Sequence, residues 1–568
     1  MYSDSTGWQT APAPVPRLAL RAWRRPRPLA VAVAALTLLL LMPIAVIAGY
    51  VLVPAIDVWR HLAATVLPGY VTGSLLLALA VGAGTLVLGT GTAWLVTLCR
   101  FPGRKLFAFA LLLPLAFPAY VIAYGYTGLL DYAGPIQTLL RDLTGWGLGD
   151  YWFPKLRSLP GAALMMTLVL YPYVYLLARA AFIEQSACVI EVSRTLGCTP
   201  WQSFFRIALP LARPAIVGGT ALAVMETLSD YGTVQHFGVP TLTTGIFRLW
   251  LGMGEAAAAA QLAALLLVAV FVVLTIERLS RGARRFAHTT GRYRRLPRFE
   301  LRGARSALAM LACGLPVLLG FALPAAALTG WTATTTGYWW RHEFLVFAGN
   351  SFTLASVAAA LAVAIGLLLG YAQRVDRSMA MPLLVRLATL GYAVPGAVVA
   401  IGVLIPLAAF DNGVDAFMRA QFGFSTGLIL SGTIVAVTFA YMVRFLPMAL
   451  HGIESGLAKI TPNMDDAARL LGRSATGIVR TVHVPLMRGS VLTAALLVFV
   501  EVMKELPATL ILRPFDFDTL AVRAYELATD EQLVAASSAA LAIVLVGILP
   551  VIVLSRAIAR SRPGDDVL

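Results

Sequence analysis

Four carboxylates occur inside apolar stretches of the sequence. Glu226 and Asp230 lie in METLSDYG, and Glu501 and Glu505 lie 275 residues later in VEVMKELP. Residues four apart share one face of a helix, and carboxylates within a membrane mark a pathway or a paired functional site. Because carboxylate and phenolate oxygens favour hard ions, the four acids and Tyr231 are candidates for a cation pathway. The four acids are also candidate transient metal ligands.

A structural role for these acids competes with that interpretation. Glu501 could pair with Lys504 or with Arg444, and Glu226 could accept hydrogen bonds from neighbouring hydroxyl groups. The acids could also form a gate at the outer mouth of a pathway. The residues alone leave these alternatives open.

A second pattern also occurs twice. EVSRTLGCTPWQSFFRIALP (191–210) and DAARLLGRSATGIVRTVHVP (466–485) each have an acid, a glycine six positions later and a proline thirteen beyond that glycine. Gly197 and Gly472 can each end a helix in the left-handed conformation, and Thr199 can cap the helix that follows. Each segment therefore predicts two helices joined by a glycine. We name these segments the first elbow and the second elbow.

The second helix of the first elbow has apolar residues at the spacing of one helix face, namely Trp201, Phe204, Phe205 and Ala208. Such a face predicts an anchor for a partner protein, in the manner of a helix seated in a groove. In the second elbow, Ser474 takes the position of the cap.

The sequence that must position these residues is that of a membrane protein. Of its 568 residues, 59% are hydrophobic and only 13% are charged, whereas soluble proteins carry about a quarter charged residues. Twelve apolar runs are long enough to cross a bilayer as helices. They lie at 29–53, 70–99, 105–130, 159–180, 212–236, 255–276, 306–328, 348–371, 380–408, 427–449, 488–511 and 533–557. The predicted fold is all-α, a polytopic membrane protein with about 12 transmembrane helices.

The net charge of +16 comes almost entirely from arginine. The basic residues flank apolar runs, as the loops on the cytoplasmic side of a membrane do, which argues against nucleic-acid binding. The segment 277–305 alone carries ten Arg against two Glu. If the spans alternate, both termini, this segment and both elbows face the cytoplasm of a bacterial cell with an inner membrane.

The sequence divides into two parallel six-span repeats. Pro118 in the first half corresponds to Pro395 in the second, just as the acids and the elbows occur at corresponding positions in both halves. Repeats of equal topology are related by an axis along the membrane normal. The predicted organisation is an N-terminal cytoplasmic tail (1–28), a first repeat (29–276), a basic cytoplasmic linker (277–305), a second repeat (306–557) and a C-terminal cytoplasmic tail (558–568).

No catalytic residue is predicted. A phosphate-binding loop needs Gly-Lys-Ser/Thr, and none of the four lysines follows a glycine. The six histidines are scattered, and no nucleophile motif of the GxSxG type occurs. We therefore expect a transporter subunit that binds no cofactor itself. A secondary transporter driven by an ion gradient is a further alternative, although it would not need two cytoplasmic elbows.

The elbows resemble the EAA loop of ABC importer permeases, over 184–211 in the first repeat and 454–486 in the second. The resemblance implies that the loops dock two copies of a separate ATPase, which would bind the ATP and Mg. It also implies that the coupling elements are Glu191, Gly197, Pro210, Asp466, Gly472 and Pro485. The sequence departs from the pattern mildly, with Val192 and Ser193 in place of two alanines and Asp466 in place of Glu.

The segment ETLSDYGTVQHFGVPTLTTGIFRLW (226–250) resembles ferric-iron permeases of the Fbp/Sfu type, as do KELPATLILRP (504–514) and YPYVYLLARAAF (171–182). This resemblance implies import of ferric iron delivered by a periplasmic or surface-tethered solute-binding protein. Thiamine and phosphonate importers share the elbows, and permeases for those solutes are the alternative.

Overall fold

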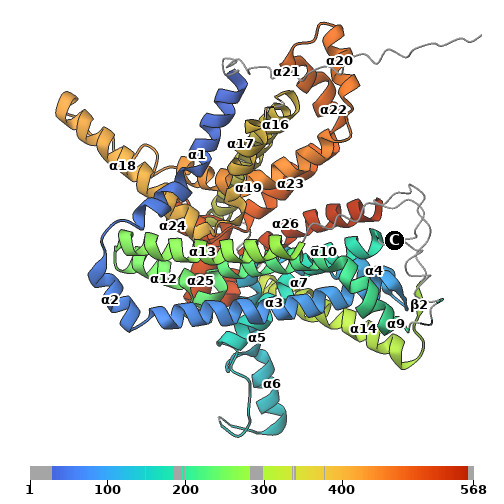
Figure 1. Ribbon diagram of the computed structural model, residues 1–568. Helices are drawn as coiled ribbons and strands as arrows, with labels where there is room; N and C mark the ends of the chain where they lie inside the picture. The colour runs from blue at the N-terminus through green and yellow to red at the C-terminus, as the bar shows by residue number, and fades with distance from the viewer. Residues whose placement is uncertain are drawn as a thin grey trace, which may run out of the picture.

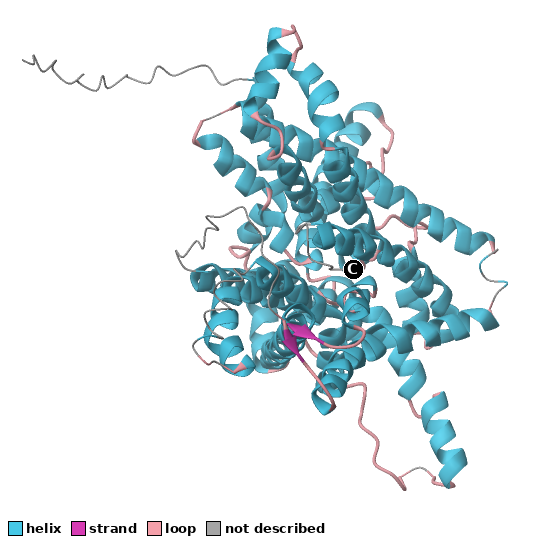
Figure 2. Ribbon diagram, turned by 90° about the vertical axis from the view of Figure 1, so that its right-hand side faces the viewer, coloured by secondary structure: helices cyan, strands magenta, loops and turns pink. Residues whose placement is uncertain are grey.

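The computed structural model describes residues 28–147, 149–184, 195, 197, 199–281, 298–335, 337, 339, 341–376 and 378–560. Within these ranges the chain is almost entirely helical (Figure 2). Ten helices are long and apolar enough to cross a membrane, or up to twelve if each of two bent pairs counts as one span. The prediction of an all-α polytopic protein is confirmed. Helices prevail because a backbone in lipid must satisfy its hydrogen bonds within its own segment.

The helices of the first repeat follow the chain from blue to green in Figure 1. They are α1 (Pro28–Tyr50), α2 (Ile56–Ala64), α3 (Leu67–Leu98), α4 (Arg104–Ala110), η1 (Leu113–Ala116), α5 (Ala119–Leu130), α6 (Pro135–Thr144), α7 (Leu159–Glu184), α9 (Pro200–Ser203), η2 (Phe204–Ala208), α10 (Leu209–Ser229), α11 (Gly232–His236), α12 (Leu242–Phe247), η3 (Arg248–Gly252) and α13 (Ala256–Arg281).

The helices of the second repeat continue from yellow to red (Figure 1). They are α14 (Ala304–Val317), η4 (Leu318–Ala322), α15 (Leu323–Thr334), α16 (His342–Val375), α17 (Ala380–Ala388), η6 (Leu390–Ala393), α18 (Gly396–Phe422), α19 (Ile434–Leu457), α20 (Pro462–Leu470), α21 (Ala475–Ile478), η7 (Val479–His483), α22 (Val484–Leu486), α23 (Arg488–Met503), α24 (Pro507–Leu512), α25 (Leu520–Thr529) and α26 (Leu533–Arg560).

The two repeats have the same order of elements. The helix α3 corresponds to α16, α7 to α19 and α11 to α24, and the π-helical turn η2 corresponds to η7. Even a single tertiary hydrogen bond recurs, since the Ser74 hydroxyl accepts from the backbone N–H of Leu242 and the Ser351 hydroxyl accepts from that of Leu520. The shared sequence pattern therefore encodes a shared fold.

The third and ninth predicted spans are broken rather than continuous. In the third, the helix axis turns by 92° between 104–116 and 119–144. The break lies at Phe117 and Pro118, and its counterpart in the second repeat lies at Val394 and Pro395, all four with extended backbone. The residue before a proline is sterically restricted to extended conformations, so the helix must stop there.

The fifth and eleventh spans are shorter than the sequence suggests. The helix α10 ends at Ser229 and α23 ends at Met503, and a separate short helix follows each of them. Asp230 and Glu505 therefore lie just beyond the helices. The expectation that each acid pair shares one helix face is wrong for this reason.

The first span of each repeat packs on the other repeat. The helix α1 lies against α17 and α18, and α15 lies against α5. Gly402 of α18 comes so close to α1 that an added Cβ would be 2.5 Å from the carbonyl oxygen of Pro43. In the reciprocal contact, the Tyr126 hydroxyl donates to the carbonyl of Leu319 at 2.7 Å. This exchange ties the halves together around a central interface.

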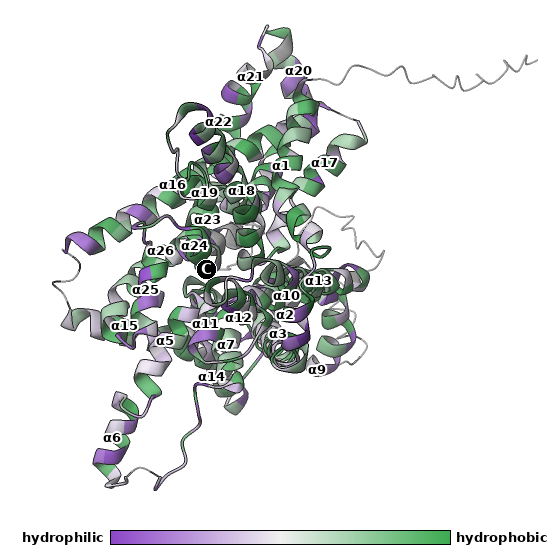
Figure 3. Ribbon diagram, turned by 90° about the vertical axis from the view of Figure 1, so that its left-hand side faces the viewer, coloured by the Kyte–Doolittle hydropathy of each residue, from purple (hydrophilic) through white to green (hydrophobic). Residues whose placement is uncertain are grey.

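Hydrophobic side chains cover the outside of the bundle as well as its core. The colours of Figure 3 show green along the long helices, with purple segments that include parts of α6 and α20. Large apolar residues such as Leu38, Leu79 and Val268 are more than half exposed, as expected for helices that face lipid. In the described residues the strands are limited to β1 (Cys99–Arg100) and β2 (Phe299–Glu300), which pair in parallel.

Candidate functional site

The four membrane carboxylates converge on a cavity between the repeats. Its volume is about 70 Å³, and Glu226, Asp230, Glu501 and Glu505 all line it. The helices α7 and α10 form one wall, and α19, α23 and α24 form the other. One water molecule needs about 10–15 Å³, so this cavity has room for only a few waters or a small ion.

Asp230 and Glu505 lie one residue before the N-caps of two short helices, Tyr231 and Leu506, and their side chains cap the first N–H groups of these helices. Asp230 accepts from the backbone N–H of Thr233 at 2.9 Å, at the start of α11. Glu505 accepts from the backbone N–H of Thr509 at 3.0 Å and from its hydroxyl at 2.8 Å, at the start of α24. An acidic side chain suits this position because the first N–H groups of a helix lack partners. Both acids thus have a structural role within the cavity wall.

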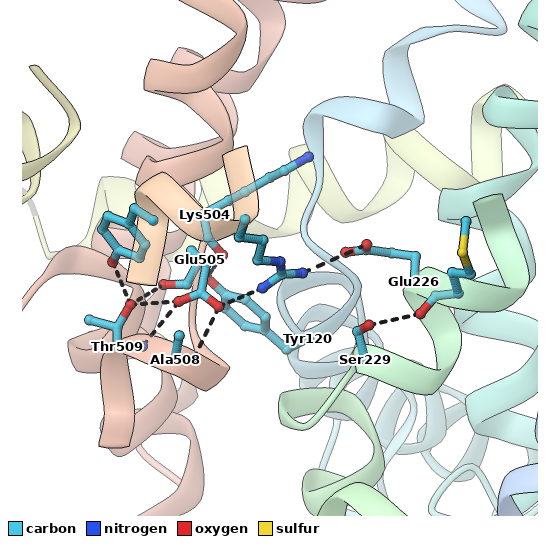
Figure 4. Close-up of polar contacts among 10 residues, drawn as sticks. Tyr120, Glu226, Ser229, Lys504, Glu505, Ala508 and Thr509 are labelled. Atoms are coloured by element: carbon cyan, nitrogen blue, oxygen red, sulfur yellow. Dashed lines mark hydrogen bonds and ion pairs between the residues drawn. The ribbon is translucent and has the colours of Figure 1, made fainter. Parts of the chain in front are cut away.

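Arg444 of α19 lies between carboxylates of the two repeats. Its guanidinium donates to Glu505 at 2.7 Å and lies 4.0 Å from Glu226. Figure 4 shows Glu226 and Glu505 on opposite sides of the gap, with dashed ion pairs crossing it. From the sequence, Arg444 was expected only as a possible partner of Glu501. Its position between Glu226 and Glu505 is revealed by the tertiary structure.

The other predicted pathway residues have local partners. Glu501 pairs with Lys504 at 2.8 Å, which is one of the alternatives that the sequence left open. Tyr231 lies outside the cavity lining: its ring stacks on Phe247 with 3.6 Å between centroids, and its hydroxyl accepts from Tyr525 at 3.3 Å. The structure thus brings the four acids together but leaves Tyr231 aside.

The expected metal-ligand set is not assembled in this conformation. Across the described ranges, no group of three or more His, Cys, Asp or Glu side chains is placed to hold a metal ion. Four carboxylates and two basic groups, Arg444 and Lys504, line the cavity. The excess of negative charge favours a cation over an anion at this place.

In the described part of the two elbows, both glycines have the backbone conformation that the sequence predicted. Gly197 and Gly472 adopt φ of +77° and +75°, in the left-handed region. The hydroxyl of Thr199 accepts from the backbone N–H of Gln202, and that of Ser474 from Gly477. The first acid of the motif, Glu191, lies outside the described residues.

The prolines at the ends of the elbows behave differently. Pro210 lies in the first turn of α10, and the helix runs without a sharp bend from Trp201 to Ser229. Beyond Pro485, the axis turns by 75° between 479–486 and 488–503. Pro485 thus precedes a bend into the membrane span, whereas Pro210 does not.

The predicted single apolar face of the first elbow is split. Phe204 and Ala208 are buried, whereas Trp201 and Phe205 are 62% and 58% exposed. The π-helical turn at 204–208 shifts the helical period and separates the two pairs. The exposed aromatic pair stacks with 5.9 Å between ring centroids, and Trp201 also stacks on Trp94. An exposed apolar surface is therefore present, but only Trp201 and Phe205 of the four predicted residues form it.

The second elbow is held by a buried ionic cluster that the sequence did not reveal. Asp465 accepts from Arg374 at 2.5 Å and contacts His483 Nε2 at 2.7 Å. The motif acid Asp466 is exposed, and its neighbour Asp465 is the buried one. The helical spacing of Asp465 and Ala468, which are both buried in α20, is the signal that could have found it.

The electrostatics of this cluster predict a pH dependence. Burial raises the pKa of Asp465, but hydrogen bonds from Arg374 and His483 outweigh burial and hold this pKa below its ordinary value. A carboxyl whose pKa is lowered by folding stabilises the fold above its unfolded pKa, about 3.9, and this contribution is lost as the pH falls through the folded pKa. We therefore expect α20 to stay ordered at neutral pH and to loosen only below about pH 4.

Hydrogen exchange of the peptide that covers α20 measures this effect. Asp465→Asn is the matched variant, because an amide keeps the shape of the side chain but does not titrate. The ratio of the two exchange rates at each pH removes the intrinsic pH dependence of exchange. A ratio that stays constant from pH 7 to about pH 3 would contradict the role given to Asp465.

Comparison with known proteins identifies the family of this fold. A family model described as "Binding-protein-dependent transport system inner membrane component" matches residues 19–285 and 362–562. These two matches each include one elbow and one acid pair. They agree with the two repeats that the sequence and the helix order show.

Several relatives resemble the chain over most of its length. It is 28% identical over 494 residues to the Fe(3+)-transport system permease protein FbpB 2 of Haemophilus influenzae, covering 85% of this chain and 89% of the relative. It is 24% identical to the ferric transport system permease protein FbpB of Actinobacillus pleuropneumoniae, covering 80% and 66%. The molybdenum transport system permease protein ModB of Escherichia coli is 30% identical, but over only 35% of this chain.

Proposed function

This chain belongs to the family of binding-protein-dependent transport system inner membrane components, and we propose that it imports ferric iron as the permease of an ABC transporter. As a member of that family it is an integral membrane subunit of a transporter rather than an enzyme. Three relatives that cover 80–85% of the chain carry names of ferric transport permeases, and one that covers 72% is named only as a probable ABC transporter permease. That shared name and length support iron as the solute.

The cavity supports a cation as the solute on independent grounds. Four carboxylates and two basic groups line it, and opposite charge raises the local concentration of a cation. This charge balance is the observation that carries the proposal.

The coupling of transport to ATP would occur at the two elbows. We propose that two copies of a separate ATPase, which binds the ATP and Mg, dock on the exposed parts of these segments. In the second elbow, Leu470 and Leu471 are 89% and 82% exposed, so they offer an apolar contact next to Asp466. Gly197 and Gly472 keep the elbows in shape. The Arg374 cluster ties the second elbow to α16, so a pull on it reaches the bundle.

The orientation follows from the same proposal. Both elbows, both chain termini and the basic segment 277–305 would face the cytoplasm, where ATP is available. A periplasmic or surface-tethered solute-binding protein would deliver iron to the opposite side. Movement of the cation then requires the cavity to open first to one side and then to the other.

Uptake into vesicles tests the proposed solute. We expect vesicles with the permease, the ATPase and the binding protein to accumulate radiolabelled ferric iron, and not thiamine or molybdate, when ATP is supplied. Charges about 4 Å apart interact by several kcal/mol in protein surroundings. Glu226→Gln combined with Glu501→Gln should therefore reduce iron uptake by more than about tenfold.

The matched control for this double variant is Glu255→Gln with Glu343→Gln, which removes one carboxylate from each repeat at positions that line neither cavity and lie outside both elbows. ATP-driven uptake of thiamine or molybdate in place of iron would overturn the assignment of the solute. Uptake that continues without the ATPase would instead indicate a secondary transporter.

A further inference from the structure

Two cavities meet at the same group of side chains. The larger cavity, of about 70 Å³, extends to Asp230 and Pro507. A smaller one, of about 30 Å³, extends to Leu222 and Met448. The residues that line both are Tyr173, Glu226, Ser229, Arg444, Phe445 and Glu501. Because Leu222 precedes Glu226 by one turn of α10, the smaller cavity lies toward the elbow end of this helix.

Arg444 and Glu226 therefore stand at the neck between the two cavities. The guanidinium comes from α19 of the second repeat, and Glu226 comes from α10 of the first. The two residues approach to 4.0 Å, so this ion pair joins the repeats across the route that a solute would take. The side chain of Arg444 is only 12% exposed, whereas that of Glu226 is 46% exposed toward the cavities.

The second repeat holds Arg444 firmly, and its contact with the first is loose. The contact with Glu505, in its own repeat, is 2.7 Å long. Gly396 makes room for this contact, since an added Cβ would lie 2.6 Å from Arg444 Nη1 and 2.7 Å from Glu505 Oε1. The longer contact with Glu226 is the one that breaks more easily.

The first repeat has no counterpart of this arginine. Val169 occupies the matching position of α7 and lines the larger cavity. A single guanidinium therefore serves both sides of the interface. This asymmetry indicates a specific role at the neck rather than a general feature of the repeated fold.

We propose that Arg444 is a tethered counter-cation that closes the neck by pairing with Glu226, and that the transported cation opens it by taking the place of the guanidinium. The proposal rests on the proposed transport of a cation. A cation that enters the larger cavity meets Glu226 as its most exposed carboxylate and competes with the guanidinium for it. Once displaced, Arg444 keeps its partner Glu505, so no unpaired charge is left buried.

The access of a neutral thiol reagent to the neck tests this proposal. Ser229 lines both cavities, so Ser229→Cys places a thiol there, and the native chain with its four cysteines is the blank. We expect Arg444→Gln and Glu226→Gln each to speed the reaction with methyl methanethiosulfonate by about two- to fivefold, as loss of a partly exposed ion pair predicts. The two changes together should give no further increase, because both remove the same contact.

Two further variants separate this role from a structural one. Arg444→Lys keeps the charge and should keep the slow rate. Arg419→Gln removes a guanidinium that pairs with Asp415 on the exposed end of α18, and it should also leave the rate unchanged. If Glu226→Gln leaves the rate unchanged while Arg444→Gln raises it, Arg444 is only the structural partner of Glu505, and the proposal is overturned.

The displacement step has its own test. Ferric citrate should raise the rate at Ser229→Cys by about fivefold, whereas magnesium citrate at equal ionic strength should not. A rate that ferric citrate leaves unchanged would overturn displacement by the cation. The rates of the two variants do not depend on the identity of the solute, so a negative uptake assay would contradict the proposed function and not the closed neck.

Discussion

Replacement of both Gly197 and Gly472 by valine is expected to abolish ATP-driven uptake while the protein still inserts into the membrane. Both glycines have φ near +75°, a conformation that costs other residues roughly 1–2 kcal/mol. If the elbows relieve this strain by changing shape, the two sites together shift the docked population by about 30- to 700-fold. Uptake of labelled solute, with the amount of permease in the vesicles measured in parallel, gives the result.

The structure supplies a control for the added bulk. Nothing lies within 4 Å of the Cβ position at Gly197, Gly472 or Gly489. Gly489 lies in the first turn of α23 and has an ordinary φ, so Gly489→Val adds the same side chain without strain and should keep its uptake. Normal uptake by the Gly197→Val, Gly472→Val protein would refute the role of the elbows in coupling.

Removal of Glu505 is expected to cause the largest loss of stability in the membrane region. The Glu505 side chain is 2% exposed and accepts from Arg444, from the backbone N–H groups of Ala508 and Thr509, and from the Thr509 hydroxyl. Glu505→Ala leaves the guanidinium buried with only the distant Glu226. Breaking a buried ion pair in this way costs about 3–5 kcal/mol. Thermal unfolding of the purified protein in detergent measures the change.

Two other acids of the cavity provide a graded comparison. Asp230→Ala removes a helix cap but no cation, so the expected cost is about 1–2 kcal/mol. Glu226→Ala removes one contact of 4.0 Å from a half-exposed side chain, and the expected cost is below about 1 kcal/mol. If Glu505→Ala and Glu226→Ala unfold at the same temperature, the Arg444–Glu505 pair contributes nothing to stability, and its description as an anchor is wrong.

The distinction between Glu226 and Glu505 shows where the sequence reached its limit. Both were predicted from the same evidence, a carboxylate in an apolar span at matching positions. The structure makes Glu505 a buried cap and ion-pair partner and leaves Glu226 half exposed at the neck. The second elbow gives a similar case. The sequence named Asp466, but the structure buries its neighbour Asp465, so burial again decides which of two acids has the structural role.

The sequence by itself determined the all-α class, the twelve apolar runs, the two repeats and the glycine-centred elbows. These features depend on local rules: the length of helix that crosses a bilayer, the conformation that a glycine permits and the recurrence of a motif. The first two rules act within about 20 residues, and the repeat is found by comparing two segments of one sequence, so none of these features requires knowledge of how the helices pack.

The tertiary structure alone decided what meets across the interface between the repeats. In the structure Arg444 lies between Glu226 and Glu505, the first span of each repeat packs on the other repeat, and Tyr231 lies away from the cavity. Contacts of this kind join residues that are hundreds of positions apart, and they depend on where each helix breaks and how closely two backbones approach. The positions of the helix breaks follow from Pro118 and Pro395, and the close approach of the backbone occurs at Gly396. Which residues then become partners is decided only when the helices pack together.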